Sequence, residues 1–103
     1  MTTRFGLSPA VLDMLQAVFQ EYDNIDAVWI YGSRARGDFR EGSDVDMAVD
    51  ASDMNDMVFA QLWNAIEELP VVYTFDVVHL QKLANQALLN NIHKNRELLY
   101  CRK

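Results

Sequence analysis

Residues 31–49, YGSRARGDFREGSDVDMAV, carry the pattern that decides how this chain folds. The segment begins where a short apolar run, AVWIY at 27–31, ends at Gly32, and it closes on DVDMAV at 44–49, in which polar and apolar residues alternate. A short apolar run is typical of a strand covered on both faces, and alternation is typical of a strand with one face covered. The segment therefore predicts two strands joined by a polar loop.

Asp44 and Asp46 lie two residues apart in the second of these strands. Alternate residues of a strand point to the same face, and two rises of about 3.3 Å place the origins of the two carboxylates roughly 6 to 7 Å apart. Mg²⁺ prefers oxygen ligands and is usually held by one or two carboxylates together with water and phosphate oxygens. Asp44 and Asp46 are thus candidate ligands of a metal pair.

Gly32 and Ser33 form a turn that ends ten residues before the first of these aspartates. Glycine lets the backbone approach a phosphate closely, and serine offers a hydroxyl and a backbone N–H as donors. A helical turn over 34–37 would direct its free N–H groups at the same anion. Arg34 and Arg36 add positive charge nearby. The loop therefore predicts a phosphate site, although each arginine taken alone is as compatible with a solvated or ion-paired role.

Asp76 is the third candidate and lies within VVYTFDVVHL at 71–80, which predicts a long central strand. A buried carboxylate is costly and usually has a metal, a hydrogen-bonding partner or a strongly raised pKa. If this strand lies beside the strand of Asp44, three carboxylates converge, and their repulsion raises the pKa of at least one of them until a metal relieves it. Asp76 would then be a metal ligand or a general base.

Helical and strand patterns alternate along the rest of the chain. Apolar spacing and end signals predict helices over 9–22, from a cap at Asp53 to Pro70, and over 81–94 with a left-handed stop at Asn95. Besides the strands at 27–31, 44–49 and 71–80, residues 97–101 predict a short edge strand. This order predicts an α/β fold in which residues 1–103 form one small domain, with a mixed sheet of three to four strands flanked by helices.

Composition narrows the classes of partner. The net charge of −6 repels nucleic acid and anionic membrane surfaces, so neither is expected as a direct partner. The single cysteine, Cys101, cannot form an internal disulfide, and no segment has the pattern of a signal peptide or of a membrane span. We therefore expect a cytoplasmic protein.

The chain resembles the minimal nucleotidyltransferases, a family within the polymerase-beta-like nucleotidyltransferase superfamily. The resemblance rests on GSRARG at 32–37, SDVDMAV at 43–49 and FDVV at 75–78. It implies that Asp44 and Asp46 hold divalent metals and that Asp76 completes an acidic triad. It also implies that Gly32 and Ser33 hold the nucleotide phosphates.

The same resemblance implies a reaction and a partner. An acceptor hydroxyl would attack the α-phosphate of ATP, with two Mg²⁺ ions organising the attacking and leaving oxygens. The acceptor would be a HEPN-domain ribonuclease toxin, with a tyrosine as the expected acceptor residue, and the chain would be its antitoxin in a hetero-oligomer. AMP transfer would neutralise the toxin.

Other interpretations stay open at this point. Asp44 and Asp46 are also compatible with exposed strand carboxylates, and Asp76 with a structural residue bonded to neighbouring backbone. Two other functional classes remain: an antitoxin that only binds its partner, and a nucleotidyltransferase that modifies a small molecule.

Overall fold

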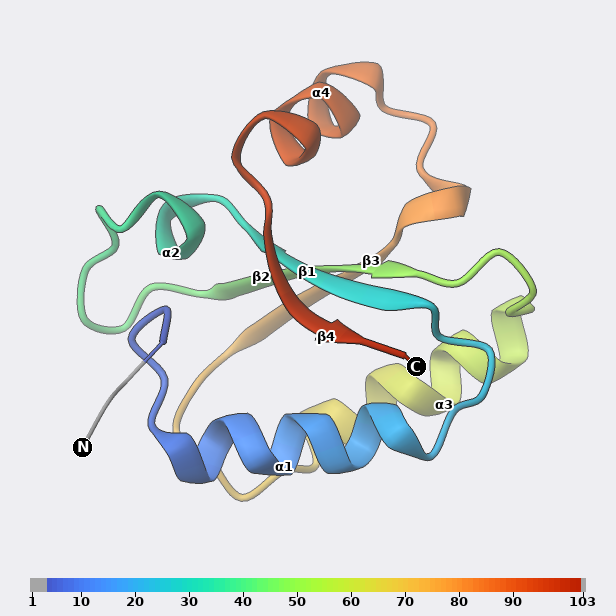
Figure 1. Ribbon diagram of the computed structural model, residues 1–103, viewed down its shortest axis with the longest axis horizontal. Coiled ribbons are helices and arrows are strands. Elements are labelled where there is room, and N and C mark those ends of the chain that lie inside the picture. Colours follow the sequence, from blue (N-terminus) through green and yellow to red (C-terminus); the bar gives the residue numbers. More distant parts are fainter. Residues whose placement is uncertain (1–3, 103) are drawn as a thin grey trace.

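A four-stranded mixed sheet with the order β3-β2-β1-β4 runs through the middle of the molecule (Figure 1). The computed structural model describes residues 4–102. The strands are β1 (Ala27–Tyr31), β2 (Val45–Asp50), β3 (Phe75–His79) and β4 (Glu97–Cys101). β1 pairs antiparallel with β2 and with β4, whereas β2 pairs parallel with β3. The parallel pair requires a crossover, which the helix between β2 and β3 provides.

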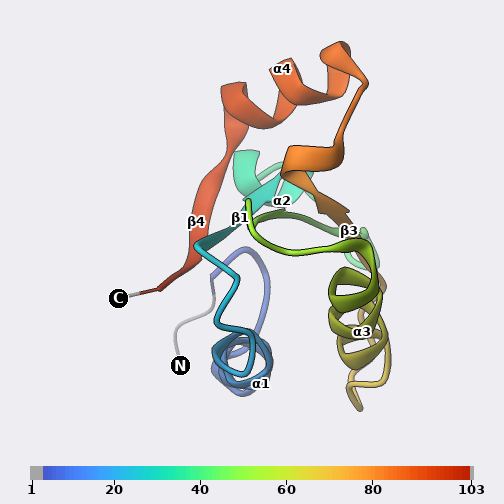
Figure 2. The ribbon, with the colours of Figure 1, turned by 90° about the vertical axis from the view of Figure 1, so that its right-hand side faces the viewer.

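Helices lie on both sides of this sheet (Figure 2). They are α1 (Pro9–Gln20), α2 (Ser33–Arg36), α3 (Asp56–Glu67) and α4 (Gln86–Asn95), with a 3₁₀ turn, η1 (Leu80–Lys82), before α4. α1 and α3 lie side by side beneath the sheet, and α4 lies above it. The predicted α/β fold, with a mixed sheet flanked by helices, is confirmed.

The larger core lies between the sheet and the α1–α3 layer. Val45, Met47 and Val49 point into it from β2 and are fully buried, together with Leu15 and Phe19 of α1. The alternation of β2 therefore places its apolar face on this layer, as predicted, and leaves its aspartates on the other face. A smaller cluster on that other face joins Tyr31 and Ala48 to Ile92 of α4.

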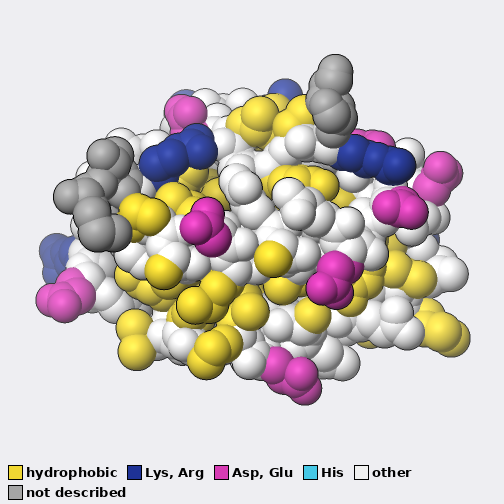
Figure 3. Space-filling view, turned by 60° about the horizontal axis from the view of Figure 1, so that its bottom comes forward, with side chains coloured by type: hydrophobic (Ala, Val, Ile, Leu, Met, Phe, Trp, Pro, Cys, Tyr) yellow, Lys and Arg dark blue, Asp and Glu magenta, His cyan; other side chains and the backbone are white. Residues whose placement is uncertain are grey.

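The outer surface of the α1–α3 layer also carries hydrophobic side chains (Figure 3). Met57 and Trp63, both on α3, are among the exposed large hydrophobic residues. Within residues 4–102, no helix reaches the length and hydropathy that crossing a bilayer requires.

The prediction of a long central strand at 71–80 is wrong in both the length and the position of the strand. β3 covers only Phe75–His79 and forms an edge of the sheet, because its one neighbour is β2. Val71 and Tyr73 still pack against the core but do so from a loop, and Val72 between them is 96% exposed. Asp76 is consequently exposed rather than buried.

Helix ends also differ from prediction, since α1 ends two residues and α3 three residues earlier than expected. Asn55, not Asp53, caps α3, since its side chain accepts a hydrogen bond from the Val58 N–H. The single helix expected at 81–94 is split into η1 and α4, because Asn85 caps a new helix at that point. α4 ends on Arg96 in extended conformation instead of a left-handed turn, which lets the chain enter β4 directly.

Candidate active site

Tyr31, Asp46 and Asp76 form a row across three strands. Asp46 of β2 lies opposite Tyr31 of β1 and beside Asp76 of β3 in the strand register. Residues paired in register share a face of the sheet, so the three side chains stand next to one another. Asp44 precedes β2, two residues before Asp46. The condition set for Asp76 in the sequence analysis is therefore met, because β3 is a neighbour of β2.

This crowding changes the protonation of the row. The pKa of Asp46 is raised, first by partial burial, then by the negative charges of Asp76 and Asp44, while Arg34 opposes the shift. Burial, with the charges of Asp46 and Asp76, raises the pKa of Tyr31 to about 12. The site therefore disfavours further negative charge and favours a cation among the carboxylates.

The Gly32–Ser33 turn lies directly against this row. Gly32 has φ +75° and ψ −150°, a conformation that only glycine adopts readily. A Cβ atom at Gly32 would lie 2.7 Å from Oδ2 of Asp46, so the backbone touches the carboxylate where a side chain would not fit. Ser33 then begins α2, whose first N–H groups have no acceptor within the helix. The structure thus brings the predicted phosphate turn and the predicted metal ligands together.

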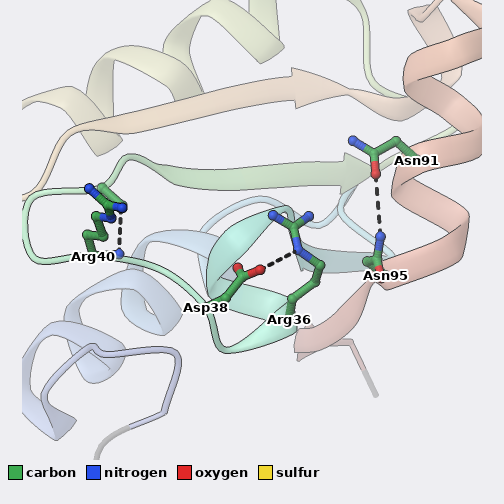
Figure 4. A network of polar contacts seen from close by, with 6 residues as sticks. Arg36, Asp38, Arg40, Asn91 and Asn95 are labelled. Atoms are coloured by element: carbon green, nitrogen blue, oxygen red, sulfur yellow. Dashed lines mark hydrogen bonds and ion pairs between the residues drawn. The ribbon is translucent and has the colours of Figure 1, made fainter.

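The two arginines of the motif lie in different environments. Arg34 is only 3% exposed, and its guanidinium donates to the carbonyl oxygens of Ser43 and Phe5. Arg36 is exposed and forms an ion pair with Asp38, with 3.2 Å between Nε and Oδ2 (Figure 4). Of the two predicted nucleotide-binding arginines, Arg36 is the one whose side chain reaches the surface.

The donor set fits a hard cation only in combination with substrate oxygens. Across residues 4–102, no three Asp, Glu, His or Cys side chains are arranged as a complete ligand set. Mg²⁺ does not require one, because it is usually held by one or two carboxylates with phosphate oxygens and water. Partial burial, followed by the charges of Asp76 and Asp44, raises the pKa of Asp46, and a cation would relieve the repulsion among these carboxylates.

A cavity of about 460 Å³ lies beside the site, between the loop at 39–43 and residues 72–74. Arg34 and Tyr73 are part of its wall, whereas the three aspartates are not. Sequence reasoning missed Tyr31, which joins the row only through the register of β1 on β2. It named Arg34 but did not predict its burial, which depends on chain segments distant in sequence.

Comparison with known proteins places this geometry in a family. The family model described as polymerase beta nucleotidyltransferase matches residues 13–103. The chain belongs to the polymerase beta nucleotidyltransferase family. That match includes all three aspartates and the Gly32–Ser33 turn of this nucleotidyltransferase domain. No curated protein shows a significant match to the whole sequence.

Solved structures share the nucleotidyltransferase fold. A toxin–antitoxin crystallised with AMP-PNP has a TM-score of 0.70 at 18% identity, over 89% of this chain and 74% of that one. The complex of tri-AMPylated Shewanella oneidensis HEPN toxin with MNT antitoxin has a TM-score of 0.63 at 17% identity, over 90% of this chain and 71% of that one. A putative nucleotidyltransferase from Sulfolobus solfataricus has a TM-score of 0.54 at 23% identity, over 88% of this chain and 77% of that one. At these identities the likeness shows the fold alone.

Proposed function

We propose that this nucleotidyltransferase is an antitoxin that transfers AMP from ATP to a hydroxyl of a HEPN-domain toxin, in a reaction that depends on Mg²⁺. The observation that carries the proposal is the contact of Gly32 with Asp46 in a row that also contains Asp76. A phosphate turn and a carboxylate cluster in contact are what nucleotidyl transfer requires, because the triphosphate and its cation must be held together.

Each residue has a distinct part in this proposal. Asp44 and Asp46 would hold Mg²⁺, with Asp76 as a further ligand. Mg²⁺, when bound, supplies positive charge at the phosphates and lowers the pKa of the attacking hydroxyl. Gly32 and the N–H and hydroxyl of Ser33 would orient the triphosphate. Arg36, exposed on α2, would add charge to this side.

The proposed chemistry is an in-line displacement at the α-phosphorus of ATP. The acceptor oxygen forms a bond to the α-phosphorus, the bond to the α,β-bridging oxygen breaks, and pyrophosphate leaves with the electron pair. The acceptor's proton passes to a carboxylate, for which exposed Asp76 is the candidate, or to solvent. The product carries AMP on the acceptor hydroxyl.

Similar folds support the choice of a HEPN partner. The MNT antitoxin of similar fold was crystallised with a HEPN toxin that carries AMP groups, and another similar toxin–antitoxin was crystallised with the ATP analogue AMP-PNP. For this chain we infer the same partner class, a tyrosine acceptor, a hetero-oligomer with the toxin, and a cytoplasmic location.

Intact mass measurement of the partner tests the proposal. The chain is incubated with ATP, Mg²⁺ and the proposed HEPN partner, in parallel with the Asp44→Ala/Asp46→Ala variant. Asp38→Ala serves as a matched carboxylate control on the exposed loop. We expect one or more AMP additions with the parent chain and the control, and none with the double variant or with EDTA.

Two other outcomes of these experiments would indicate one of the two other functional classes. A stable complex without mass change, in which the double variant still neutralises the toxin, would identify a binding-only antitoxin. Modification of a small molecule by the purified chain alone would identify a small-molecule nucleotidyltransferase.

A further inference from the structure

Arg34 is a buried cation that joins three separate segments. Its Nε and Nη2 donate to the carbonyl oxygen of Ser43 at 3.3 and 2.8 Å, and its Nη1 donates to the carbonyl oxygen of Phe5 at 2.8 Å. The planar fork of arginine matches this double contact with one oxygen, which a lysine ammonium cannot reproduce. Ser43 is the residue immediately before Asp44, so Arg34 binds the main chain next to a proposed metal ligand.

Aromatic rings hold the guanidinium in place. Its central carbon lies 4.7 Å from the ring centroid of Phe39 and 5.4 Å from that of Tyr73. The Tyr73 hydroxyl in turn donates to the carbonyl oxygen of Gly6 at 3.3 Å. Each cation–ring contact adds attraction that grows as water is excluded. Two rings and two carbonyl oxygens thus compensate the charge of a side chain that is almost entirely buried.

An amino-terminal turn closes over the same arginine. Arg4 and Leu7 form an antiparallel bridge, with backbone hydrogen bonds of 3.2 and 2.8 Å between them. Gly6 within the turn approaches so closely that a Cβ atom there would lie 2.7 Å from Nη1 of Arg34 and 2.5 Å from the Phe39 ring. The turn is therefore packed onto Arg34 rather than merely adjacent to it.

The loop over residues 38–43 is attached to its surroundings at both ends. At its start, the Asp38 N–H donates to the Ser33 carbonyl at 3.1 Å, and Asp38 forms an ion pair with Arg36 of α2. Towards its end, the Ser43 N–H donates to the Arg40 carbonyl at 3.0 Å and the Arg40 N–H donates to the Ser43 hydroxyl at 3.0 Å, and these two bonds close the loop on itself. Arg34 attaches this second end at the Ser43 carbonyl, just before β2.

We propose that Arg34 is a positioning residue, which fixes Ser43 between α2 and the amino-terminal turn and so sets Asp44 in place beside Asp46. This inference deepens the proposed function, on which its kinetic readout rests. It replaces the phosphate contact that the sequence alone predicts for Arg34. Residues that orient a metal ligand from behind typically affect metal affinity or activity about 10- to 100-fold when they are changed.

The test compares Arg34→Gln with Arg40→Gln, an exposed arginine of the loop whose hydrogen bond to Ser43 uses its main-chain N–H. Mn²⁺, as a probe for Mg²⁺, is titrated in the presence of AMP-PNP by electron paramagnetic resonance, with AMP-PNP alone as the blank, and amide hydrogen exchange is followed over residues 38–44. For Arg34→Gln we expect Mn²⁺ affinity to fall about tenfold, with faster exchange in the loop. We also expect kcat to fall about tenfold or more while KM for ATP changes less than about threefold. Arg40→Gln should leave Mn²⁺ affinity and loop exchange as in the parent chain.

Opposite results would overturn the proposal. A rise in KM for ATP with unchanged kcat, Mn²⁺ affinity and loop exchange would make Arg34 a phosphate ligand. If the parent chain transfers no AMP, the proposed function fails, while Mn²⁺ affinity and exchange still decide the role of Arg34. If Arg34→Gln does not fold, Phe39→Ala decides instead, because it removes one ring and leaves the arginine. Weaker Mn²⁺ binding by Phe39→Ala supports the positioning role, and unchanged binding rejects it.

Discussion

Asp46 is the residue on which the site converges. It faces Tyr31 and Asp76 across the sheet and touches the backbone of Gly32. Partial burial, followed by the charges of Asp76 and Asp44, raises the pKa of Asp46. A carboxylate whose pKa is raised in this way lowers the stability of the folded protein when it is ionised. A role in binding explains why such a destabilising group is present.

Asp46→Asn is predicted to stabilise the folded protein at neutral pH. Because the pKa of Asp46 is raised on folding, its contribution to stability is greatest below the ordinary carboxyl range and is lost as pH rises through the folded pKa. The amide removes this loss, so we expect Tm at pH 7 to rise by about 2–4 °C. Thermal unfolding of both proteins between pH 4 and pH 7 measures this difference in Tm, and the difference should become smaller toward pH 4. A lower Tm at pH 7, or a gain that does not depend on pH, would contradict this account of the row.

Gly32→Ala is predicted to damage the site through geometry alone. The substitution places a Cβ atom against Asp46 and requires φ +75°, for a strain of about 1–3 kcal/mol. We expect AMP transfer to fall about 100-fold, the effect of misplacing a reacting group by roughly 1 Å. Gly37→Asn is the matched control, since nothing lies within 4 Å of that position and asparagine tolerates its left-handed conformation. Equal activity of the two variants would refute the proposed contact.

At the scale of elements, helix starts are set by burial as much as by capping residues. Asp53 and Asn55 are both good caps, and the choice between them depends on Met54. Met54 is 2% exposed and donates its N–H to the Ala51 carbonyl, so the chain is still in a buried turn where the sequence predicts a helix. α3 therefore begins after Asn55.

Asn55→Ala is predicted to lower the free energy of unfolding by about 1 kcal/mol, because the Val58 N–H loses its acceptor. Asp53→Ala should change it by less than about 0.5 kcal/mol, since only the main-chain carbonyl of Asp53 is used, by Asn24. Urea unfolding measures both. The reverse order would mean that Asp53 caps α3 in solution.

The strands show how much of the fold could be predicted from the sequence. Apolar spacing predicted β1 and β4 with their observed bounds, and period-two alternation predicted which face of β2 carries Asp46. The length and edge position of β3 were not predicted, because an apolar run does not reveal which of its residues enter a ladder. The row of Tyr31 with Asp46 and the burial of Arg34 likewise depend on register and on distant segments, which local patterns do not encode.

At the scale of the whole molecule, the two faces of the sheet have different roles. Its lower face builds the larger core with α1 and α3, while its upper face carries Asp46 and Asp76 and is the face on which α4 lies (Figures 1 and 2). The alternation of helices and strands along the chain was sufficient to predict this architecture. The net charge of −6 repels a free triphosphate, so the proposed reaction calls for a cation at the site.

Metal and nucleotide are therefore predicted to stabilise the protein only in combination. At a ligand concentration of about 100 times Kd, binding adds about 2.7 kcal/mol to the free energy of unfolding. We expect Mg²⁺ with AMP-PNP to raise Tm clearly, AMP-PNP with EDTA to leave it unchanged, and the Asp44→Ala/Asp46→Ala variant to respond to neither. Stabilisation by AMP-PNP without a divalent cation would argue against a carboxylate-held metal.

The measurement that tests the central claim most directly is the position of the transferred phosphate. The chain, the proposed HEPN partner and Mg²⁺ are incubated with ATP labelled at either the α- or the γ-phosphate, and the label on the partner is counted. Nucleotidyl transfer through Asp44, Asp46 and Asp76 predicts label from α-labelled ATP only, lost when Asp44 and Asp46 are changed to alanine. Label from γ-labelled ATP, or no label beside a neutralised toxin, would contradict it.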